Sequence, residues 1–219
     1  MMEPMITSTR RWLLPVLFAW PLFSWAQTPP SAPRVKFTTN QGDIVLELDA
    51  KAAPATVANF LNYVRDKHYD GTVFHRVIDG FMIQGGGFDA QLRERPTRAP
   101  IAHEGRQALE RGGMRNINGT IAMARTSDPN SATAQFFINV RDNAFLDPST
   151  QSIGYTVFGQ VVSGMDVVQK IKSVPTGPGG PFRSDVPRTP VIIQTATLDR
   201  KSTRLNSSHV ALSRMPSSA

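Results

Sequence analysis

The sequence predicts an all-β domain with two helices, in which the strands close into an antiparallel barrel. Several segments of the 219-residue chain alternate apolar and polar residues with a period of two, as half-buried strands do. Only two segments are predicted helices, and they stand apart from each other. Strands and helices do not alternate regularly along the chain, which argues against a parallel α/β sheet and favours a closed antiparallel barrel.

The first elements are a hairpin and a helix. Val35–Thr39 and Ile44–Leu48 alternate in polarity and are joined by a polar turn, which predicts two paired strands. From Pro54 the period changes, and Pro54–Asp66 is predicted as an amphipathic helix with its proline in the first turn, where a missing N–H costs nothing. Its apolar positions, which we expect to pack on the sheet rather than bind a partner, are Val57, Phe60, Leu61 and Val64.

The remaining elements follow from the same reasoning. The other predicted strands are Val73–Ile78, Phe81–Ile83, Ile121–Ala124, Gln135–Val140, Tyr155–Val162 and Val191–Leu198. A second helix is predicted over Gly164–Ile171, capped by Ser163. Ala90–Gly113 is expected to be a long polar loop with one short strand around Ile101, and Gly177–Pro181 a Gly/Pro loop.

The two ends of the chain differ from its centre. Residues 1–26 are predicted to be a secretory signal peptide, because Arg10 and Arg11 precede an apolar run that ends at Ser24-Trp25-Ala26; an uncleaved membrane anchor is the alternative. Residues 27–33 are a proline-rich spacer, and 34–199 form the domain. Residues 200–219 are either a disordered tail or a foreign segment from cloning or sequence assembly. The leader predicts export to the periplasm, with no stable membrane insertion after cleavage.

Charge and residue types exclude several function classes. The formal net charge is +7, but 18 basic and 16 acidic residues lie in 27–199, so no nucleic-acid partner is expected. The chain has no cysteine, and its four histidines are scattered at positions 68, 75, 103 and 209, without the spacing of a zinc site. We therefore expect no metal site and no cofactor, and we interpret His103 as an exposed loop residue.

The segment Phe74–Asp89 carries the most unusual residues. Arg76 lies inside an apolar strand, Asp79-Gly80 forms a hairpin turn, and Gln84 is followed directly by three glycines. An arginine in this position is either an ordinary edge-strand charge or a functional group. The three glycines indicate a bulge or a close approach by another backbone.

A second segment favours the functional interpretation. In Gln135–Val140 the period of two places Gln135, Phe137 and Asn139 on one face, and Phe136, Ile138 and Val140 on the other. The second set is a core face. The first places an aromatic ring between two amides, which suits a half-polar groove.

These segments resemble the cyclophilins, a family of peptidyl-prolyl cis-trans isomerases, and in particular their bacterial periplasmic and cytoplasmic type. The matching stretches are Phe74–Gly86, Met123–Arg125, Ser131–Ile138 and Tyr155–Gly159, and the likeness extends from about Val35 to Leu198. The resemblance implies an eight-stranded antiparallel barrel with a helix closing each end. It also implies catalysis of X-Pro isomerisation in proline-containing polypeptide clients.

The resemblance also assigns roles to residues. Arg76 matches the catalytic arginine of the family. Phe81, Met82, Phe137 and Leu146 match the pocket for the proline ring, and Gln84 matches the glutamine that holds the arginine and the substrate backbone. The positions that match the groove for residues before the proline are Ala124, Arg125 and Gln135.

Two positions of the expected binding site depart from the eukaryotic pattern. Tyr155 replaces a histidine, and Phe145 replaces the tryptophan of the members most sensitive to cyclosporin, so only weak cyclosporin binding is expected.

A monomer is expected, because a closed barrel has few free strand edges. The alternative function is a chaperone or scaffold that binds proline segments with incidental isomerase activity. A hydrolase is disfavoured, since no Gly-x-Ser-x-Gly motif is present.

Overall fold

The computed structural model describes residues 32–199. The predicted leader, most of the predicted spacer and the predicted tail lie outside the described residues. Within residues 32–199, no helix is both long and apolar enough to cross a membrane.

Eight strands close into one barrel in the order β1-β10-β3-β4-β6-β5-β7-β2, and each neighbouring pair is antiparallel. The predicted barrel is therefore confirmed. The barrel strands are β1 (Arg34–Thr39), β2 (Gly42–Leu48), β3 (Thr72–Ile78), β4 (Met82–Asp89), β5 (Thr120–Met123), β6 (Phe136–Asn139), β7 (Val157–Ser163) and β10 (Ile192–Leu198).

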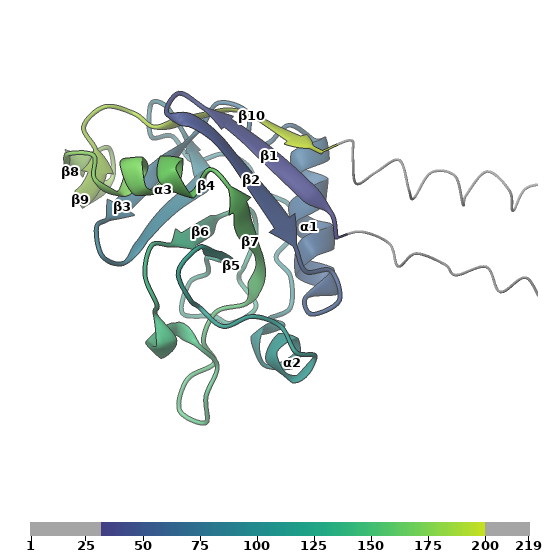
Figure 1. Ribbon diagram of the computed structural model, residues 1–219. Coiled ribbons are helices and arrows are strands. Elements are labelled where there is room, and N and C mark those ends of the chain that lie inside the picture. The colour runs from purple at the N-terminus through teal and green to yellow at the C-terminus, as the bar shows by residue number, and fades with distance from the viewer. Residues whose placement is uncertain (1–31, 200–219) are drawn as a thin grey trace, which may run out of the picture.

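Two helices pack against this barrel from different sides. Figure 1 shows α1 (Pro54–Arg65) and α3 (Met165–Lys172) on opposite sides of the strands. The apolar face of α1 contributes Phe60 to the barrel core, and α3 contributes Val168 and Ile171. The core-facing role predicted for the first helix is thus confirmed, and the second predicted helix also contributes to the core.

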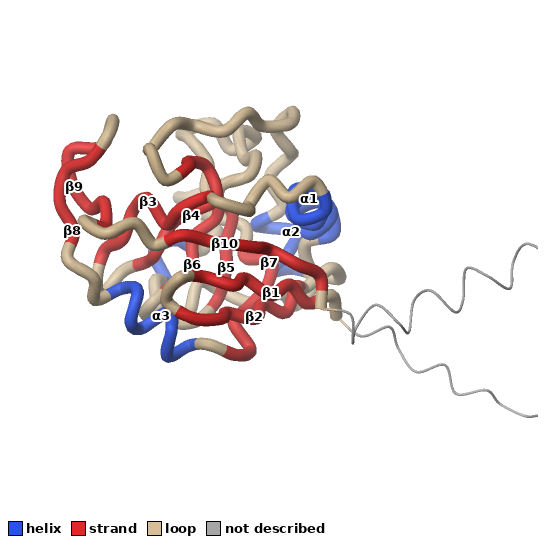
Figure 2. The backbone as a smooth tube through the Cα atoms, turned by 90° about the horizontal axis from the view of Figure 1, so that it is seen from above, coloured by secondary structure: helices blue, strands red, loops and turns tan. Residues whose placement is uncertain are grey.

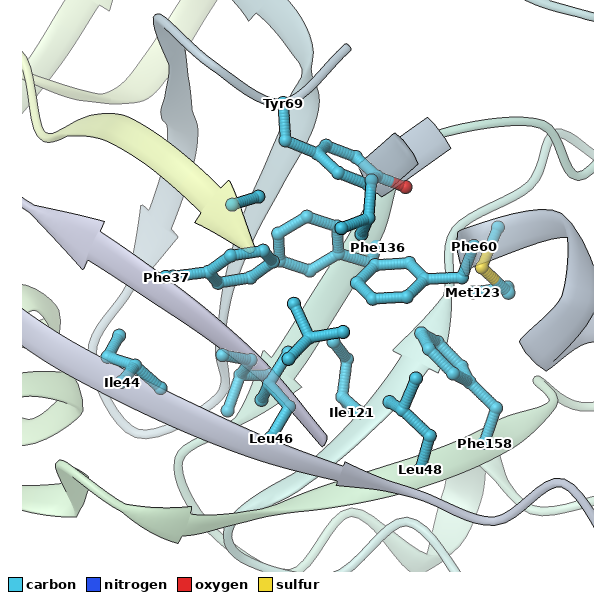
Figure 3. Close-up of a cluster of buried hydrophobic side chains, with 14 of the residues drawn as sticks. Phe37, Ile44, Leu46, Leu48, Phe60, Tyr69, Ile121, Met123, Phe136 and Phe158 are labelled. Carbon is cyan, nitrogen blue, oxygen red and sulfur yellow. The ribbon is translucent and has the colours of Figure 1, made fainter. Parts of the chain in front are cut away.

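The centre of the barrel is filled by aromatic rings, drawn in Figure 3. Phe37 stacks on Phe136 with 5.3 Å between ring centroids, and Phe60 lies 5.1 Å from both Tyr69 and Phe158. Each large apolar side chain that is fully buried contributes about 1.5–3 kcal/mol by its removal from water. This packing gives the barrel wall a rigid inner side, so its outer face can hold side chains in fixed positions.

The start of α1 is capped from a distant part of the chain. Glu104 accepts hydrogen bonds from the backbone N–H groups of Ala55 and Thr56, at 3.2 and 2.7 Å, and from the Thr56 hydroxyl at 2.7 Å. A carboxylate at this end also interacts favourably with the helix dipole. Pro54 occupies the first turn, as predicted.

Four local predictions were wrong. The loop predicted over 90–113 contains a short helix, α2 (Gly105–Glu110), and His103 is half-buried rather than exposed. The predicted loop 177–181 contains most of a strand and the turn of a two-stranded hairpin, whose strands are β8 (Thr176–Gly179) and β9 (Phe182–Pro187). Ser163 does not cap α3; the cap position is Gly164, with a left-handed φ of 84°.

The β8–β9 hairpin stands beside β3, on the side of the barrel away from α1 (Figures 1 and 2). Its sequence is rich in glycine and proline, which hides the strand pattern. The hairpin packs against β3, the strand that carries Arg76, where Phe182 contacts His75.

Candidate active site

A row of directly paired residues crosses the outer face of the barrel. Arg76 on β3 is opposite Gln84 on β4, Gln84 is opposite Phe137 on β6, and Phe137 is opposite Ala122 on β5. Residues that face each other across antiparallel strands project to the same side of the sheet. Since the neighbours of Phe137 along β6, Phe136 and Ile138, belong to the barrel core, this row lies outside it.

An irregularity in β3 directs Arg76 outward. Phe74 and Val77 both belong to the inner core, although a regular strand would place them on opposite faces. The pairing register with β4 shifts between Phe74 and Arg76, which is the signature of a bulge. The bulge lets two successive residues, His75 and Arg76, lie away from the inner core.

A pocket of about 170 Å³ opens along this row. Its lining contains nine of the eleven residues that the sequence singled out: Arg76, Phe81, Met82, Gln84, Ala124, Arg125, Phe137, Leu146 and Tyr155. The structure therefore brings together residues from β3, β4 and β6 and from the loops around them. The roles that the resemblance gives these residues remain predictions.

The other two singled-out residues lie at the edge of the pocket. Gln135 accepts a hydrogen bond from the Gln84 side-chain amide at 3.1 Å. Phe145 belongs to the short 3-10 helix η1 (Ala144–Leu146), is 66% exposed, and stacks on Phe81 with centroids 5.7 Å apart. Both residues therefore support a lining residue rather than forming the pocket wall.

The pocket has an apolar floor and a polar rim. Met82 and Phe137 are buried and pack with Ala122 and Val157 in a second apolar cluster, distinct from the barrel core. Arg76 is exposed, and its side chain has neither a hydrogen bond nor an ion pair within residues 32–199. A guanidinium with five free N–H donors thus stands beside an apolar cavity.

The far side of the pocket is held by Arg125 and Tyr155. The guanidinium carbon of Arg125 lies 4.7 Å from the centroid of the Tyr155 ring, and that ring meets Phe137 edge-on at 5.5 Å. Arg125 also donates to the carbonyl of Gly154 through Nε and Nη2, at 3.2 and 2.8 Å.

A buried polar network supports the pocket from behind, and sequence reasoning missed it. The amide of Asn143 donates to the Phe81 carbonyl at 2.9 Å and to the Asn139 side chain at 2.7 Å. Asn139 in turn donates to Thr120 and Asn116. Asn139 was expected to line the groove, but it is fully buried in this network instead.

The network continues to the second wall of the pocket. Asn116 donates to the Leu146 carbonyl at 3.2 Å and to Asp147 at 3.0 Å. Since Phe81 and Leu146 both line the pocket, the buried amides fix two of its walls relative to each other. Three asparagines, at 116, 139 and 143, flanking two apolar strands are a visible signal of such a network.

His75 lies next to Arg76 but faces another environment. Its ring packs against Phe88 at 4.7 Å and against Phe182 of the β8–β9 hairpin at 5.3 Å. Burial lowers the pKa of His75 to about 4, and the charge of Arg76 acts in the same direction. His75 is therefore neutral at pH 7 and anchors the hairpin rather than entering the pocket.

Within residues 32–199, no group of three or more His, Asp or Glu side chains is placed to hold a metal ion.

Comparison with known proteins identifies the family. The profile of the family "Cyclophilin type peptidyl-prolyl cis-trans isomerase/CLD" matches residues 34–198. The chain is 53% identical over 167 residues to "Peptidyl-prolyl cis-trans isomerase B" of Escherichia coli (strain K12), which covers 75% of this chain and 98% of the relative. It is 48% identical over 179 residues to "Peptidyl-prolyl cis-trans isomerase A" of Dickeya dadantii (strain 3937), covering 82% and 91% of the two chains.

Solved structures agree with these matches. The chain resembles cyclophilin AquaCyp293 from Hirschia baltica with a TM-score of 0.60 and 29% identity, over 77% of this chain and 74% of the other. The barrel, the matched range and the relatives lead to one conclusion: the chain belongs to the cyclophilin-type peptidyl-prolyl cis-trans isomerases.

Proposed function

We propose that this protein catalyses the cis–trans isomerisation of X-Pro peptide bonds in the pocket beside Arg76, without forming a covalent intermediate. The observation that carries the proposal is the unpaired guanidinium of Arg76 at the rim of a small apolar pocket. Three relatives that are 48–54% identical are named peptidyl-prolyl cis-trans isomerases, and the matched region covers more than nine-tenths of the length of each.

The reaction requires only that a twisted amide be stabilised. Rotation about a peptide bond has a barrier of about 18–20 kcal/mol, because conjugation between nitrogen and carbonyl is lost on the way. In the twisted form the proline nitrogen regains its lone pair and becomes a better hydrogen-bond acceptor. A donor that binds this form more strongly than the planar form lowers the barrier.

Different residues of the pocket bind different parts of the substrate. We assign the proline ring to the apolar floor of Met82, Phe137 and Leu146, where burial holds it in place. Arg76 is always charged and donates toward the proline nitrogen. Gln84 is opposite Arg76 and is hydrogen-bonded to Gln135, so its carbonyl and amide have a fixed position for the substrate backbone.

The energy required is modest. A thousandfold acceleration corresponds to about 4 kcal/mol of differential stabilisation. One charge-assisted hydrogen bond contributes about 1.5–3 kcal/mol. Holding the proline ring while the carbonyl before it rotates supplies the remainder, so neither a nucleophile nor a metal is needed.

The proposal is tested by exchange spectroscopy on a proline tetrapeptide with the purified protein. Catalytic amounts of the protein should accelerate exchange between the cis and trans isomers of the peptide and broaden their resonances. Without a catalyst the isomers interconvert over tens of seconds or longer. A folded protein that leaves this exchange at the uncatalysed rate would refute the isomerase proposal.

The alternative function is chaperone-like binding in the same groove. The two functions separate in a refolding assay with a client whose slow phase is limited by proline isomerisation. An isomerase accelerates that phase at substoichiometric concentration. A binding protein reduces aggregation only near stoichiometric concentration and leaves the slow phase unchanged.

We further propose that the protein is exported to the periplasm and acts there as a monomer. The proposal for export is supported by Arg10, Arg11 and the apolar run that follows them. A closed barrel with few free edges supports the monomer.

Cell fractionation with sequencing of the mature N-terminus tests the proposed export, since cleavage is expected before Gln27. Light scattering of the purified protein tests the proposed monomer.

Cyclosporin binding is proposed to be weak. Phe145 is mostly exposed and is engaged with Phe81, and it presents no indole N–H to a ligand. A calorimetric titration should give a dissociation constant in the micromolar range or weaker. Nanomolar affinity would contradict this proposal.

A further inference from the structure

Arg125 is held in a fixed orientation at the pocket rim. Its Nε and Nη2 atoms donate to the Gly154 carbonyl, and Nη1 donates to the Thr126 carbonyl at 2.8 Å. The face of the guanidinium rests on the Tyr155 ring. Because the side chain is already ordered, a ligand that binds it loses little further rotamer entropy.

These contacts leave part of the guanidinium unused. A guanidinium has five N–H donors, and three of those of Arg125 are engaged, which leaves one on each Nη nitrogen. Two donors on adjacent nitrogens are what a carboxylate accepts with its two oxygens. Arg125 is only half-buried, so a peptide in the pocket has access to them.

No acidic residue of the pocket neutralises this charge. The nine lining residues include Arg76 and Arg125 and neither Asp nor Glu, and Arg125 has no ion pair within residues 32–199. Nearby carboxylates are engaged elsewhere: Asp147 binds Asn116 and Arg115, Glu104 caps α1, and Asp128 accepts from the backbone of Asn130. The pocket lining itself therefore carries two positive charges and no negative charge.

We propose that the groove prefers proline segments that carry a carboxylate one or two residues before the proline, and that Arg125 binds that carboxylate. This proposal rests on the isomerase function proposed above and defines its substrate class. An exposed ion pair of good geometry should favour the acidic peptide about two- to fivefold, and the preference should weaken as salt is added.

The test compares acetylated tetrapeptide amides that differ only in charge. Ala-Glu-Pro-Phe is paired with Ala-Gln-Pro-Phe, and Glu-Ala-Pro-Phe with Gln-Ala-Pro-Phe. With the wild-type protein at low salt, kcat/KM for at least one Glu peptide should exceed that of its Gln partner about threefold. The ratio should fall to one in Arg125→Gln.

Two further variants test whether the preference depends on Arg125 itself rather than on net charge or on misfolding. Lys51→Gln removes one positive charge from an exposed turn away from the pocket, and it should retain the wild-type ratio. If Arg125→Gln does not fold, Arg125→Lys keeps the charge without the planar fork and should lower the ratio. A wild-type ratio of one at both positions, or a ratio that survives the loss of Arg125, would overturn the proposal.

The substrate preference and the isomerase function fail in different ways. If the Gln peptides are isomerised and the Glu peptides gain nothing, the function stands and the preference is wrong. If no peptide is isomerised, the proposed function is wrong. The substrate preference is then tested by binding: chemical-shift titration gives the dissociation constants of the Glu and Gln peptides, and the Glu peptide should bind about threefold more tightly.

Discussion

Arg76 and Gln84 are directly opposite each other on β3 and β4, and both project from the outer face of the barrel into one pocket. The pairing places a charged donor beside an amide that is itself oriented by Gln135. The position of Arg76 is therefore set by strand register and by the bulge at His75, not by an ion pair.

Gly87 provides the space in which Gln135 reaches Gln84. A Cβ at this position would lie 2.5 Å from Cγ and 2.6 Å from Nε2 of Gln135. Gly87→Ala should displace that side chain and break its hydrogen bond, lowering kcat/KM about two- to tenfold, which corresponds to the loss of one neutral hydrogen bond. Steady-state kinetics and thermal unfolding measure the two effects, and the melting temperature should change little.

Gly86→Ala is the matched control for Gly87→Ala. Its Cβ would lie 2.9 Å from the rings of Phe136 and Tyr69, and its φ is +87°, so this variant should lose stability instead. If Gly87→Ala kept full activity while its structure showed Gln135 displaced, the role of that amide would be disproved.

Asn143 connects Phe81 of the pocket to Asn139 in the buried polar network. Asn143→Ala leaves the buried Asn139 side-chain oxygen without its donor and removes one of the two donors to the Phe81 carbonyl, which keeps the backbone N–H of Val140. This should lower the free energy of unfolding by about 1–3 kcal/mol. KM should rise as well, because Phe81 loses its support. Urea unfolding and kinetics check both effects. Asn118→Ala, an exposed neighbour in the same region, should change neither.

Glu104 should stabilise the protein through the N-terminus of α1. Glu104→Ala removes the acceptor of two backbone N–H groups and one hydroxyl, at an expected cost of about 1–2 kcal/mol in the free energy of unfolding. Glu110→Ala changes the same charge on exposed α2 and should have little effect. Equal stability of the two variants in urea would refute the capping role.

His75 should make stability depend on pH in the acid range. Its folded pKa is about 4 against 6.5 for an unperturbed histidine, so below about pH 6.5 the unfolded chain binds a proton that the folded protein excludes. Unfolding free energy should therefore fall between pH 6.5 and 4, by at most about 1.4 kcal/mol per pH unit from this group. His75→Gln should show a shallower decline in urea unfolding series, and an identical decline would contradict the assignment.

The sequence predicts the barrel and most of the pocket because both depend on local patterns. Alternation in Val35–Thr39 and Ile44–Leu48 specifies strands whatever their partners are. The outward face of β6 is visible from the placement of Phe137 between two amides. Resemblance to a family then adds the roles of residues such as Phe81 and Leu146, which no local pattern could assign.

The missed features depend on contacts between distant segments. Glu104 caps a helix 48 residues earlier in the sequence, and no local signal connects the two. The β8–β9 strands are too rich in glycine and proline for a pattern of period two. Asn139 was placed in the groove because face alternation cannot distinguish a solvent-lined position from one covered by the loop that carries Asn143.

The catalytic role of Arg76 is tested most directly by comparing wild type with Arg76→Ala. Both kcat/KM for a proline tetrapeptide and the dissociation constant of that peptide are measured. If Arg76 stabilises the twisted amide, kcat/KM should fall about 10- to 100-fold, as expected for a lost charge-assisted hydrogen bond, while peptide affinity changes only slightly. Circular dichroism should show an intact fold, since the Arg76 side chain makes no hydrogen bond or ion pair within residues 32–199. Unchanged kcat/KM in the folded variant, or a loss matched entirely by weaker peptide binding, would show that Arg76 does not stabilise the twisted amide.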